Sequence, residues 1–334
     1  MSRPLAAIAK RLASGDRREL AHLITEVENR TARGRAVLRA IYPVTGKAWV
    51  IGLAGPLGVG KSSLLNALIA HLRDLGRTVA VVAVDPSSPF SGGSVLGDRI
   101  RLDRAPDDPG IFIRSMASRG HSGGLARATR EVVRLVEAAG FGIVLVETVG
   151  SGQVDVEIRE VATTSVVVLV PHLGDEVQTL KAGLFEIADV FCVNKSDLPG
   201  ADRARRDLGE LVSLGTAEPG WTPPVLATST LVPSGIRELW EAIAGHEAYL
   251  DASGRRKEGE RRRLLLEIRS IARDRFESEL DRDPALGRLI EPVLEHRLDP
   301  ERAADRWWSQ RGRSRRRSST ADGTRTRSSP SRRK

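Results

Sequence analysis

Residues 55–62 read Gly55-Pro56-Leu57-Gly58-Val59-Gly60-Lys61-Ser62, and no other segment is as informative about the fold of this chain. It matches the pattern G-x₄-G-K-[ST], in which glycines let backbone amides enclose phosphates, the lysine reaches the β- and γ-phosphates, and the serine hydroxyl binds Mg²⁺. An apolar run precedes it and a helix-forming stretch follows it, as a phosphate-binding strand–loop–helix unit requires. A glycine-rich turn without a ligand is the simpler alternative, but such a turn needs neither the lysine nor the serine. We therefore predict a P-loop that binds a nucleotide through residues 55–63, including Ser63.

The chain from Trp49 to about Leu250 alternates short apolar segments with amphipathic ones. The short segments are rich in β-branched residues and nearly continuous in apolar character, which is typical of strands buried on both faces. They are Trp49–Ala54, Val79–Asp85, Gly142–Glu147, Ser165–Val170, Val190–Asn194 and Val225–Ser229. The helical segments are Lys61–Leu75, Gly124–Ala139, Glu176–Ile187 and Gly235–Leu250. This order predicts an α/β fold, a three-layer P-loop NTPase with a mainly parallel sheet whose ligand lies beyond the carboxyl ends of the strands.

Helical patterns flank this central region, which we assign to residues 46–250. Residues 1–45 are expected to form an N-terminal helical extension, because residues 2–38 have a helical pattern and Asp16 and Glu19 have capping-box spacing. Residues 251–310 are expected to form a helical arm that ends near two exposed-looking tryptophans, Trp307 and Trp308. Residues 311–334 are rich in Arg and Ser and almost free of apolar residues, so a disordered tail is expected there.

Composition narrows the class of protein but does not identify it. The formal net charge is +9, and residues 311–334 carry ten Lys or Arg and one Asp, which leaves residues 1–310 neutral (9 − 9 = 0). A neutral folded part predicts no specific nucleic-acid partner. The apolar runs are too short to cross a membrane and no secretory signal is evident, so a cytoplasmic location is expected. The single cysteine, Cys192, excludes an internal disulfide and a cysteine-cluster metal site.

Acidic residues at two other strand ends suit a metal bound beside the P-loop. Asp85 and Glu147 each end an apolar strand, and a P-loop needs such carboxylates to hold Mg²⁺ and its waters. Each alone could be a solvated strand end.

The loops that follow these strands offer further candidate residues. After Glu147, Gly150 is placed to donate its N–H to a γ-phosphate, and Gln153 could orient the attacking water or could lie on the surface. Residues 85–99 suit a mobile switch loop, from which Asp98 could approach the metal. A second glycine-rich loop, residues 118–124, offers Arg119 and His121 to a phosphate or partner, or simply initiates a helix.

A separate motif predicts that the base is guanine. Asn194-Lys195-Ser196-Asp197 follows a predicted strand and matches N-K-x-D, in which the Asp carboxylate accepts both the N1–H and the exocyclic amine of guanine. Adenine lacks this donor pair and would leave the carboxylate unpaired. Ser229-Thr230-Leu231 follows the next strand, where a loop is expected to close over the guanine. GTP or GDP with Mg²⁺ is therefore the predicted ligand set.

These motifs together resemble the MeaB/ArgK-type GTPases, chaperones of cobalamin-dependent acyl-CoA mutases such as methylmalonyl-CoA mutase. The resemblance covers about residues 10–300 and is carried by Gly55–Ser63, Val84–Ser88, Gly92–Asp98, Phe112–Ser115, Gly123-Gly124, Glu147–Gln153, Gly174–Gln178 with Lys181, and Val193–Asp197. It implies a GTP-hydrolysing enzyme that forms a homodimer through the helical arm. Two features depart from the family: Ser122 stands where a large apolar residue is more usual, and the Arg/Ser tail has no counterpart.

The resemblance also assigns roles to individual residues. It implies phosphate contact by Lys61 and guanine contact by Asn194, Lys195 and Asp197. It further implies that the metal or its waters contact Ser62, Asp85, Asp98 and Glu147. Gly174–Lys181 would be an additional switch that senses the mutase, although a helix N-terminus with a buried Leu180 explains that stretch equally simply.

Two other functions remain open at this point. A metallochaperone GTPase for a nickel enzyme shares the sheet and the motifs but needs clustered Cys and His ligands, and here Cys192 lies in a strand and the six histidines are scattered. A protein kinase acting on a transport component would use ATP, against which Asp197 argues. A non-catalytic binding module is disfavoured because Lys61, Ser62, Asp85 and Glu147 are all present.

Overall fold

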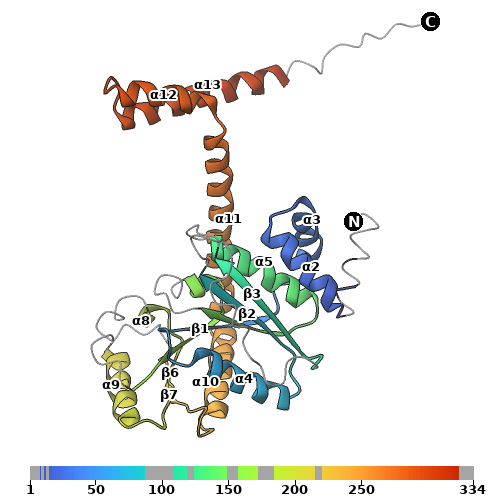
Figure 1. The fold of residues 1–334 in the computed structure, drawn as a ribbon, viewed down its shortest axis with the longest axis vertical. Coiled ribbons are helices and arrows are strands. Elements are labelled where there is room, and N and C mark those ends of the chain that lie inside the picture. The colour runs from blue at the N-terminus through green and yellow to red at the C-terminus, as the bar shows by residue number, and fades with distance from the viewer. Residues whose placement is uncertain are drawn as a thin grey trace, which may run out of the picture. The chain divides into compact units, whose positions relative to one another are not determined.

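A computed structural model defines residues 8, 11–12, 15–86, 108–118, 124–148, 157–171, 184–214 and 220–322 (Figure 1). Side chains are described throughout these ranges except at 85–86, 117–118, 124–126, 184 and 312–322. The described chain divides into two compact units, residues 1–267 and 268–334. The first unit contains the sheet, and the described residues of the second unit form helices and their connections, with no strand.

The described strands form one seven-stranded parallel sheet, in the order β3-β2-β4-β1-β5-β6-β7. Every register pair is parallel, so all carboxyl ends lie at one edge. The strand β1, which leads into the P-loop, lies at the centre between β4 and β5. The strands are β1 Trp49–Ala54, β2 Val79–Pro86, β3 Ile111–Ser118, β4 Ile143–Thr148, β5 Thr164–Leu169, β6 Val190–Val193 and β7 Val225–Ala227. The predicted α/β fold is confirmed.

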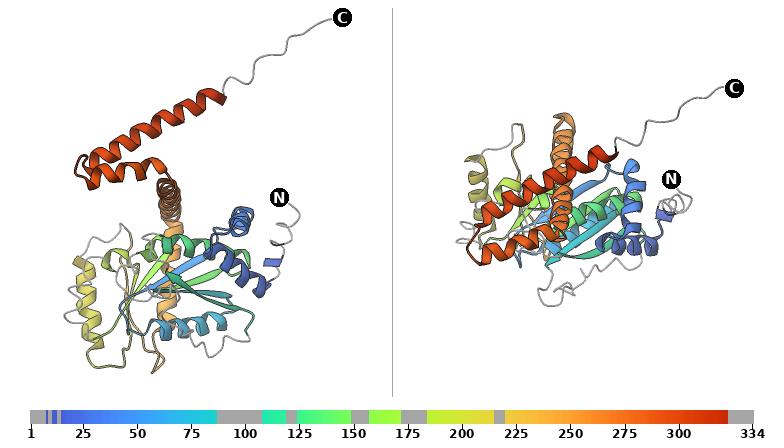
Figure 2. Two further views of the ribbon diagram at one scale, coloured as in Figure 1. Left: turned by 45° about the horizontal axis from the view of Figure 1, so that its top comes forward. Right: turned by 90° about the horizontal axis from the view of Figure 1, so that it is seen from above.

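Helices cover both faces of the sheet, and successive residues of the strands supply two separate cores. In β1, Val50 and Ala54 point into one core, while Ile51 and Leu53 point into the other. Helices α2, α3, α5 and α9 contribute to the first core, and α4 and α10 to the second (Figure 2). These helices are α2 Arg17–Glu28, α3 Ala32–Ile41, α4 Lys61–Asp74, α5 Gly124–Ala138, α9 Ala201–Leu214 and α10 Ile236–Ala252. The short elements are η1 Tyr42–Val44, η2 Ile158–Glu160 and α8 Leu184–Ile187.

The N-terminal segment is helical, as expected, and includes the helices α2 and α3. The side chain of Asp16 accepts a bond from the backbone N–H of Glu19 at 3.0 Å and caps α2. Arg30 has a left-handed backbone (φ 52°) and ends that helix. Thr31 then caps α3 by accepting from the backbone N–H of Gly34 at 3.0 Å. The turn lets both helices place apolar residues in the core beside α5.

Two elements of the sheet domain were not predicted. The edge strand β3 carries Arg114 and Ser115 at its centre, which interrupts the apolar pattern. Arg114 is half-buried because its guanidinium donates to the carboxylate of Glu28 at 2.5 Å, on helix α2. Helix α9 has only a few buried positions, chiefly Leu208 and Val212, among many charged residues. Both elements therefore lack the strong periodicity from which the others were inferred.

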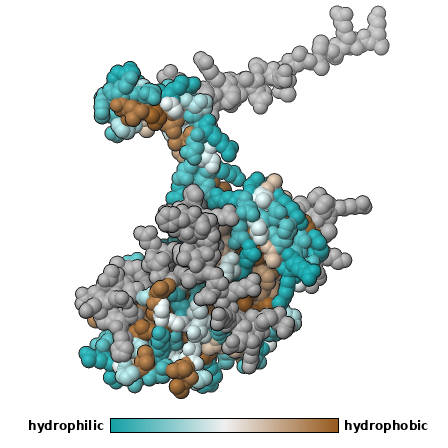
Figure 3. All heavy atoms as spheres, in the orientation of Figure 1, coloured by the Kyte–Doolittle hydropathy of each residue, from teal (hydrophilic) through white to brown (hydrophobic). Residues whose placement is uncertain are grey.

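The second unit contains the end of α11 Arg255–Asp281, then α12 Pro284–Leu294 and α13 Pro300–Asp322. The expectation that both tryptophans are exposed was wrong for Trp307, which is 4% exposed. Its indole N–H donates to Asp283 at 2.8 Å and its ring packs edge-on against Phe276. Apolar side chains of α12 remain at the surface, as Figure 3 shows in brown. Helix α13 extends to Asp322, into the stretch for which composition predicts disorder.

Candidate nucleotide site

The P-loop turns sharply between β1 and α4 and draws its lysine inward. Gly55, Gly58 and Gly60 all have positive φ angles, of 141°, 79° and 87°, which side-chain-bearing residues rarely adopt. Lys61 begins α4 and is 6% exposed. Its ammonium donates to the carbonyl oxygens of Gly55 at 2.6 Å and Pro56 at 2.9 Å. The positive charge is thus fixed inside the loop, where an anion bound by the backbone amides would meet it.

A hydroxyl–carboxylate pair lies directly behind the P-loop. The Ser62 hydroxyl donates to the carboxylate of Glu147 at 2.6 Å, and Glu147 is buried at the end of β4. On the neighbouring strand, Ala83 is in register with Glu147, so the backbone of Asp85 lies two residues farther along at the same edge. Oxygen ligands at close range suit Mg²⁺, which keeps several of its own waters. The residues present therefore fit the predicted metal.

The N-K-x-D segment is bonded to the P-loop itself. The Asn194 side-chain amide donates to the carbonyl oxygen of Val59 at 2.8 Å, and Lys195 donates to that of Gly58 at 2.9 Å. A Cβ added to Gly60 would lie 2.6 Å from the Asn194 amide nitrogen, so only glycine allows this approach. The parallel sheet brings the two motifs together because β1, β5 and β6 are neighbours.

Thr228 is a site residue that the sequence reasoning missed. It is fully buried, and its hydroxyl donates to the side-chain oxygen of Asn194 at 3.1 Å. The thiol of Cys192 lies 3.0 Å from the same hydroxyl. These contacts orient the Asn194 amide with its nitrogen toward Val59. The only feature of the sequence that points to Thr228 is its position directly before Ser229 at the end of a strand.

Asp197 is exposed and is held by the loop after β7. The Ser229 hydroxyl donates to the Asp197 carboxylate, and the backbone N–H of Val232 donates to the Ser229 hydroxyl at 3.1 Å. Ser229 and Ser234 form an antiparallel bridge that closes this loop. Leu231 is 81% exposed and Thr230 is half-buried, so the loop presents an apolar side chain beside the carboxylate.

Comparison with known proteins identifies the family of this arrangement. Residues 20–285 match the family model described as "Methylmalonyl Co-A mutase-associated GTPase MeaB". The chain belongs to the MeaB family of GTPases.

Relatives of this MeaB-family chain are similar over most of its length. GTPase ArgK of Escherichia coli is 40% identical, over 75% of this chain and 78% of its own. The mitochondrial methylmalonic aciduria type A homolog of Mus musculus is 32% identical, over 88% and 76% of the two chains. The crystal structure of a LAO/AO transport system kinase superposes with a TM-score of 0.71 at 30% identity, covering 92% of this chain and 97% of that one.

Family membership establishes GTP hydrolysis and guanine-nucleotide binding, while the roles of individual residues stay predictions. The structure brings together the P-loop, Glu147, the N-K-x-D segment and Ser229. Five predicted features lie outside the described residues, as does the side chain of Asp85: Asp98, Gly150, Gln153, the loop residues 119–123 and the segment 174–181. Among the described helices of this MeaB-family protein, none combines the length and apolar character that a membrane span requires.

Proposed function

We propose that this MeaB-family GTPase is a chaperone of a cobalamin-dependent acyl-CoA mutase, such as methylmalonyl-CoA mutase. In this role GTP hydrolysis gates the loading or protection of the mutase's cobalamin. Support comes from the family description, which names association with methylmalonyl-CoA mutase, and from a mouse relative named for methylmalonic aciduria. The structural observation that favours a nucleotide gate is the bond from Asn194 to Val59, because it couples the base end of the site to the phosphate end.

We assign the nucleotide contacts as follows. The P-loop amides and Lys61 bind the phosphates, while Asn194, Lys195 and Asp197 read the guanine. Ser229, Thr230 and Leu231 cover the base, with Ser229 holding the Asp197 carboxylate in place. Because Lys195 donates to Gly58, its aliphatic stem lies across the loop where a base would stack. The GTP γ-phosphate would be sensed by Gly150.

The hydrolytic step needs charge neutralisation and an oriented water. Mg²⁺, when bound, neutralises charge that develops between the β- and γ-phosphates. Ser62 and Glu147 would hold it, with Asp85 and Asp98 contributing from β2 and the following loop. Glu147 also accepts a hydrogen bond from the Ser62 hydroxyl, so the serine oxygen keeps a lone pair directed away from the carboxylate. Gln153 would orient the attacking water.

We further propose a homodimer formed through the C-terminal helices. Ile290, Leu294 and Trp308 are between 50% and 66% exposed in the second unit. Apolar side chains exposed on one helical unit are typical of a protein–protein interface. Sedimentation of the full chain and of Ile290→Asp would test this assignment, and an unchanged monomer in both would refute it.

The mutase proposal is tested by adding purified apo- and holo-mutases to the full-length protein. The GTP hydrolysis rate and the transfer of cobalamin are measured for the methylmalonyl-, isobutyryl- and ethylmalonyl-CoA enzymes. One of them should accelerate hydrolysis, since an arginine supplied in trans is worth roughly 10³–10⁵ in rate. A pull-down with GDP and then with a non-hydrolysable GTP analogue would identify the partner independently. If no mutase changed either quantity, the chaperone role would fail while GTP hydrolysis would stand.

One alternative has a specific observation in its favour. The solved structure with a TM-score of 0.71 is named for a transport system kinase. A kinase would transfer the γ-phosphate of a nucleotide to a protein hydroxyl. Incubation with γ-labelled GTP and ATP, followed by detection of labelled protein, separates this function from simple hydrolysis.

A further inference from the structure

The first half of α11, residues 255–267, belongs to the first unit and contacts the rest of that unit mainly through charged side chains. No residue of 255–267 belongs to either hydrophobic core. The described contacts include Arg256 with Glu247 at 3.1 Å and Arg263 with the carbonyl oxygen of Ala162 at 3.3 Å. Partly exposed ion pairs such as that of Arg256 with Glu247 contribute little net stability, because water can replace each partner. This half of the helix is therefore attached in a way that allows release.

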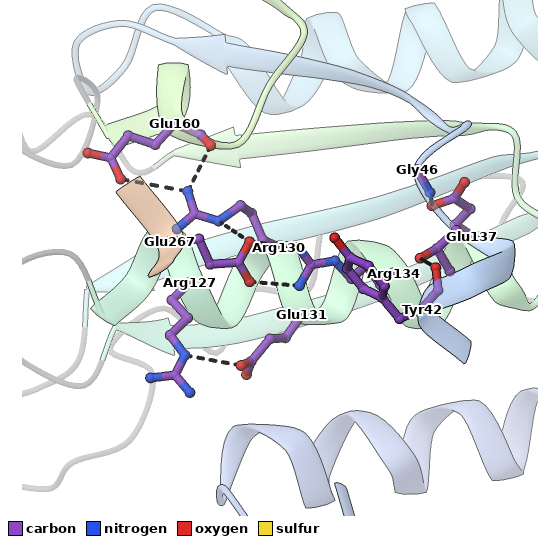
Figure 4. Close-up of polar contacts among 10 residues, drawn as sticks. Tyr42, Gly46, Arg127, Arg130, Glu131, Arg134, Glu137, Glu160 and Glu267 are labelled. Carbon is purple, nitrogen blue, oxygen red and sulfur yellow. Dashed lines mark hydrogen bonds and ion pairs between the residues drawn. The ribbon is translucent and has the colours of Figure 1, made fainter. Parts of the chain in front are cut away.

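The strongest of these contacts joins α11 to α5 (Figure 4). Arg134 donates two parallel bonds to the carboxylate of Glu267, at 2.7 and 2.6 Å. Glu267 is only 5% exposed. Burial alone would raise the pKa of Glu267, but the bonds and charge of Arg134 and the charge of Arg130 hold that pKa below its ordinary value. The carboxylate is thus ionised, and its burial depends on the two arginines.

Arg130 links the same carboxylate to η2. Its guanidinium donates to the carbonyl oxygen of Glu160 at 2.8 Å, and its Nε lies 3.5 Å from the Glu267 carboxylate (Figure 4). Arg130 is 7% exposed, yet neither its Nε nor its Nη2 has a hydrogen-bond partner among the described residues. A buried guanidinium held so incompletely contributes little net stability. Charge networks of this kind are better suited to a switch between two arrangements.

The η2 segment lies beside the strands that end at the nucleotide. It is the first described segment after β4, whose Glu147 accepts a hydrogen bond from the Ser62 hydroxyl. Ile158 fills the space above Gly52 in β1, where an added Cβ would lie 2.3 Å from its side chain. Thr163 also donates to the carbonyl oxygen of Val50 at 2.8 Å. A displacement of β1 or β4 would therefore also displace Glu160.

We propose that Arg130, Arg134 and Glu267, which we name the α5–α11 ion-pair cluster, transmit the nucleotide state from η2 to α11. Glu267 is the last residue of the first unit, and α11 continues from it into the second. When Glu160 shifts, the ion pairs and hydrogen bonds of this cluster that hold α11 against α5 become stronger or weaker. This role requires that the protein binds and hydrolyses GTP, and it does not depend on which partner protein is bound.

Hydrogen–deuterium exchange of the full chain tests the proposal. Exchange of peptides covering residues 255–267 is compared with GDP and with a non-hydrolysable GTP analogue. Wild type should show a several-fold difference in exchange between the two nucleotides. Glu267→Gln should abolish that difference, and Arg134→Lys, which keeps the charge but loses the paired bonds, should reduce it. Glu258→Gln, an exposed change on the same helix, should leave it intact.

Peptides covering residues 55–62 report nucleotide binding in the same experiment and should respond in every variant. The proposal is overturned if 255–267 exchanges identically with both nucleotides in wild type while 55–62 responds. It is equally overturned if the difference at 255–267 persists in both Glu267→Gln and Arg134→Lys. Circular dichroism checks folding, and should Glu267→Gln fail to fold, the wild-type comparison and Arg134→Lys decide the question.

Discussion

The side-chain amide of Asn194 donates to the carbonyl oxygen of Val59 at 2.8 Å, so the base-reading loop and the phosphate loop are one bonded structure. The two residues are 135 positions apart in the chain. A ligand that displaces one loop must therefore strain the other. This relationship explains why a substitution at either end of the site should affect the whole nucleotide.

Asp197→Asn should reduce the preference for GTP over ATP by roughly 10²-fold or more, because the amide cannot accept from both guanine donors. Competition titration of a fluorescent GTP analogue with GTP and ATP measures the ratio. Asp202→Asn, an exposed change on α9, is the control and should leave the ratio unchanged. An undiminished preference in Asp197→Asn would remove the basis for the guanine assignment.

Thr228→Val should weaken GTP binding about fivefold, which corresponds to the loss of about 1 kcal/mol from one buried hydrogen bond. The reason is that Asn194 loses the donor that orients its amide. Isothermal titration with GDP and GTP gives the affinities. Thr222→Val makes the same change at an exposed threonine and should bind normally. Equal affinities in both variants would show that Thr228 has no positioning role.

Glu147→Gln should raise the Mg²⁺ concentration needed for half-maximal hydrolysis by roughly 10–100-fold, as expected when a residue that orients a metal ligand is neutralised. Single-turnover hydrolysis at increasing Mg²⁺ measures this shift, and chelation of Mg²⁺ should stop the reaction in wild type. Glu241→Gln on the exposed face of α10 is the matched control. A Mg²⁺ dependence identical to wild type would exclude Glu147 from the metal site.

Glu137→Ala should lower the free energy of unfolding by roughly 1 kcal/mol, because three backbone N–H groups, of which only that of Ala48 is half-buried, would lose their shared acceptor. The Glu137 carboxylate accepts from the backbone N–H groups of Gly46 at 2.7 Å and Ala48 at 2.9 Å, and from that of Lys47 (Figure 4). It thereby fixes the entry into β1. Urea unfolding measures the change, with Glu258→Ala as the exposed control. A loss no greater than that of the control would contradict this role.

Stability should decrease as the pH falls from about 6.5 toward 4 because of His246. Burial, with the charges of Arg159 and Arg256, lowers the pKa of His246 from 6.5 to about 4. The native ring is then neutral in a range where the unfolded chain binds a proton, so protonation favours unfolding. This contribution to the free energy of unfolding is fully present above pH 6.5, and up to about 3 kcal/mol of it is lost as the pH falls toward 4. The Asp189 carboxylate, 3.5 Å from the His246 ring, would attract the protonated ring and reduce that loss.

Urea unfolding at pH 7 and pH 4.5 measures this dependence. His246→Gln should flatten the difference between the two pH values, whereas His22→Gln, at an exposed position, should not. If His246→Gln kept the full wild-type slope, another group would have to carry it.

Local sequence patterns were sufficient to predict the P-loop, the N-K-x-D segment, six strands and most of the helices of the sheet domain. These features depend on neighbouring residues, since Gly60 and Lys61 act through local backbone geometry, and a buried strand such as β1 is marked by its own apolar run. Residues whose local pattern is weak, such as Arg114 in β3, could not be placed in this way.

Contacts between side chains that are distant in the sequence became visible only in the folded chain. Thr228 reaches Asn194 because β6 and β7 are adjacent, and Glu267 reaches Arg134 across 133 positions because α11 crosses α5 there (Figure 4). Such pairs leave no periodic signal, since each residue is an ordinary polar one in its own segment. The order of strands and the path of the connecting helices place them together, and that order follows from burying both faces of one sheet at once.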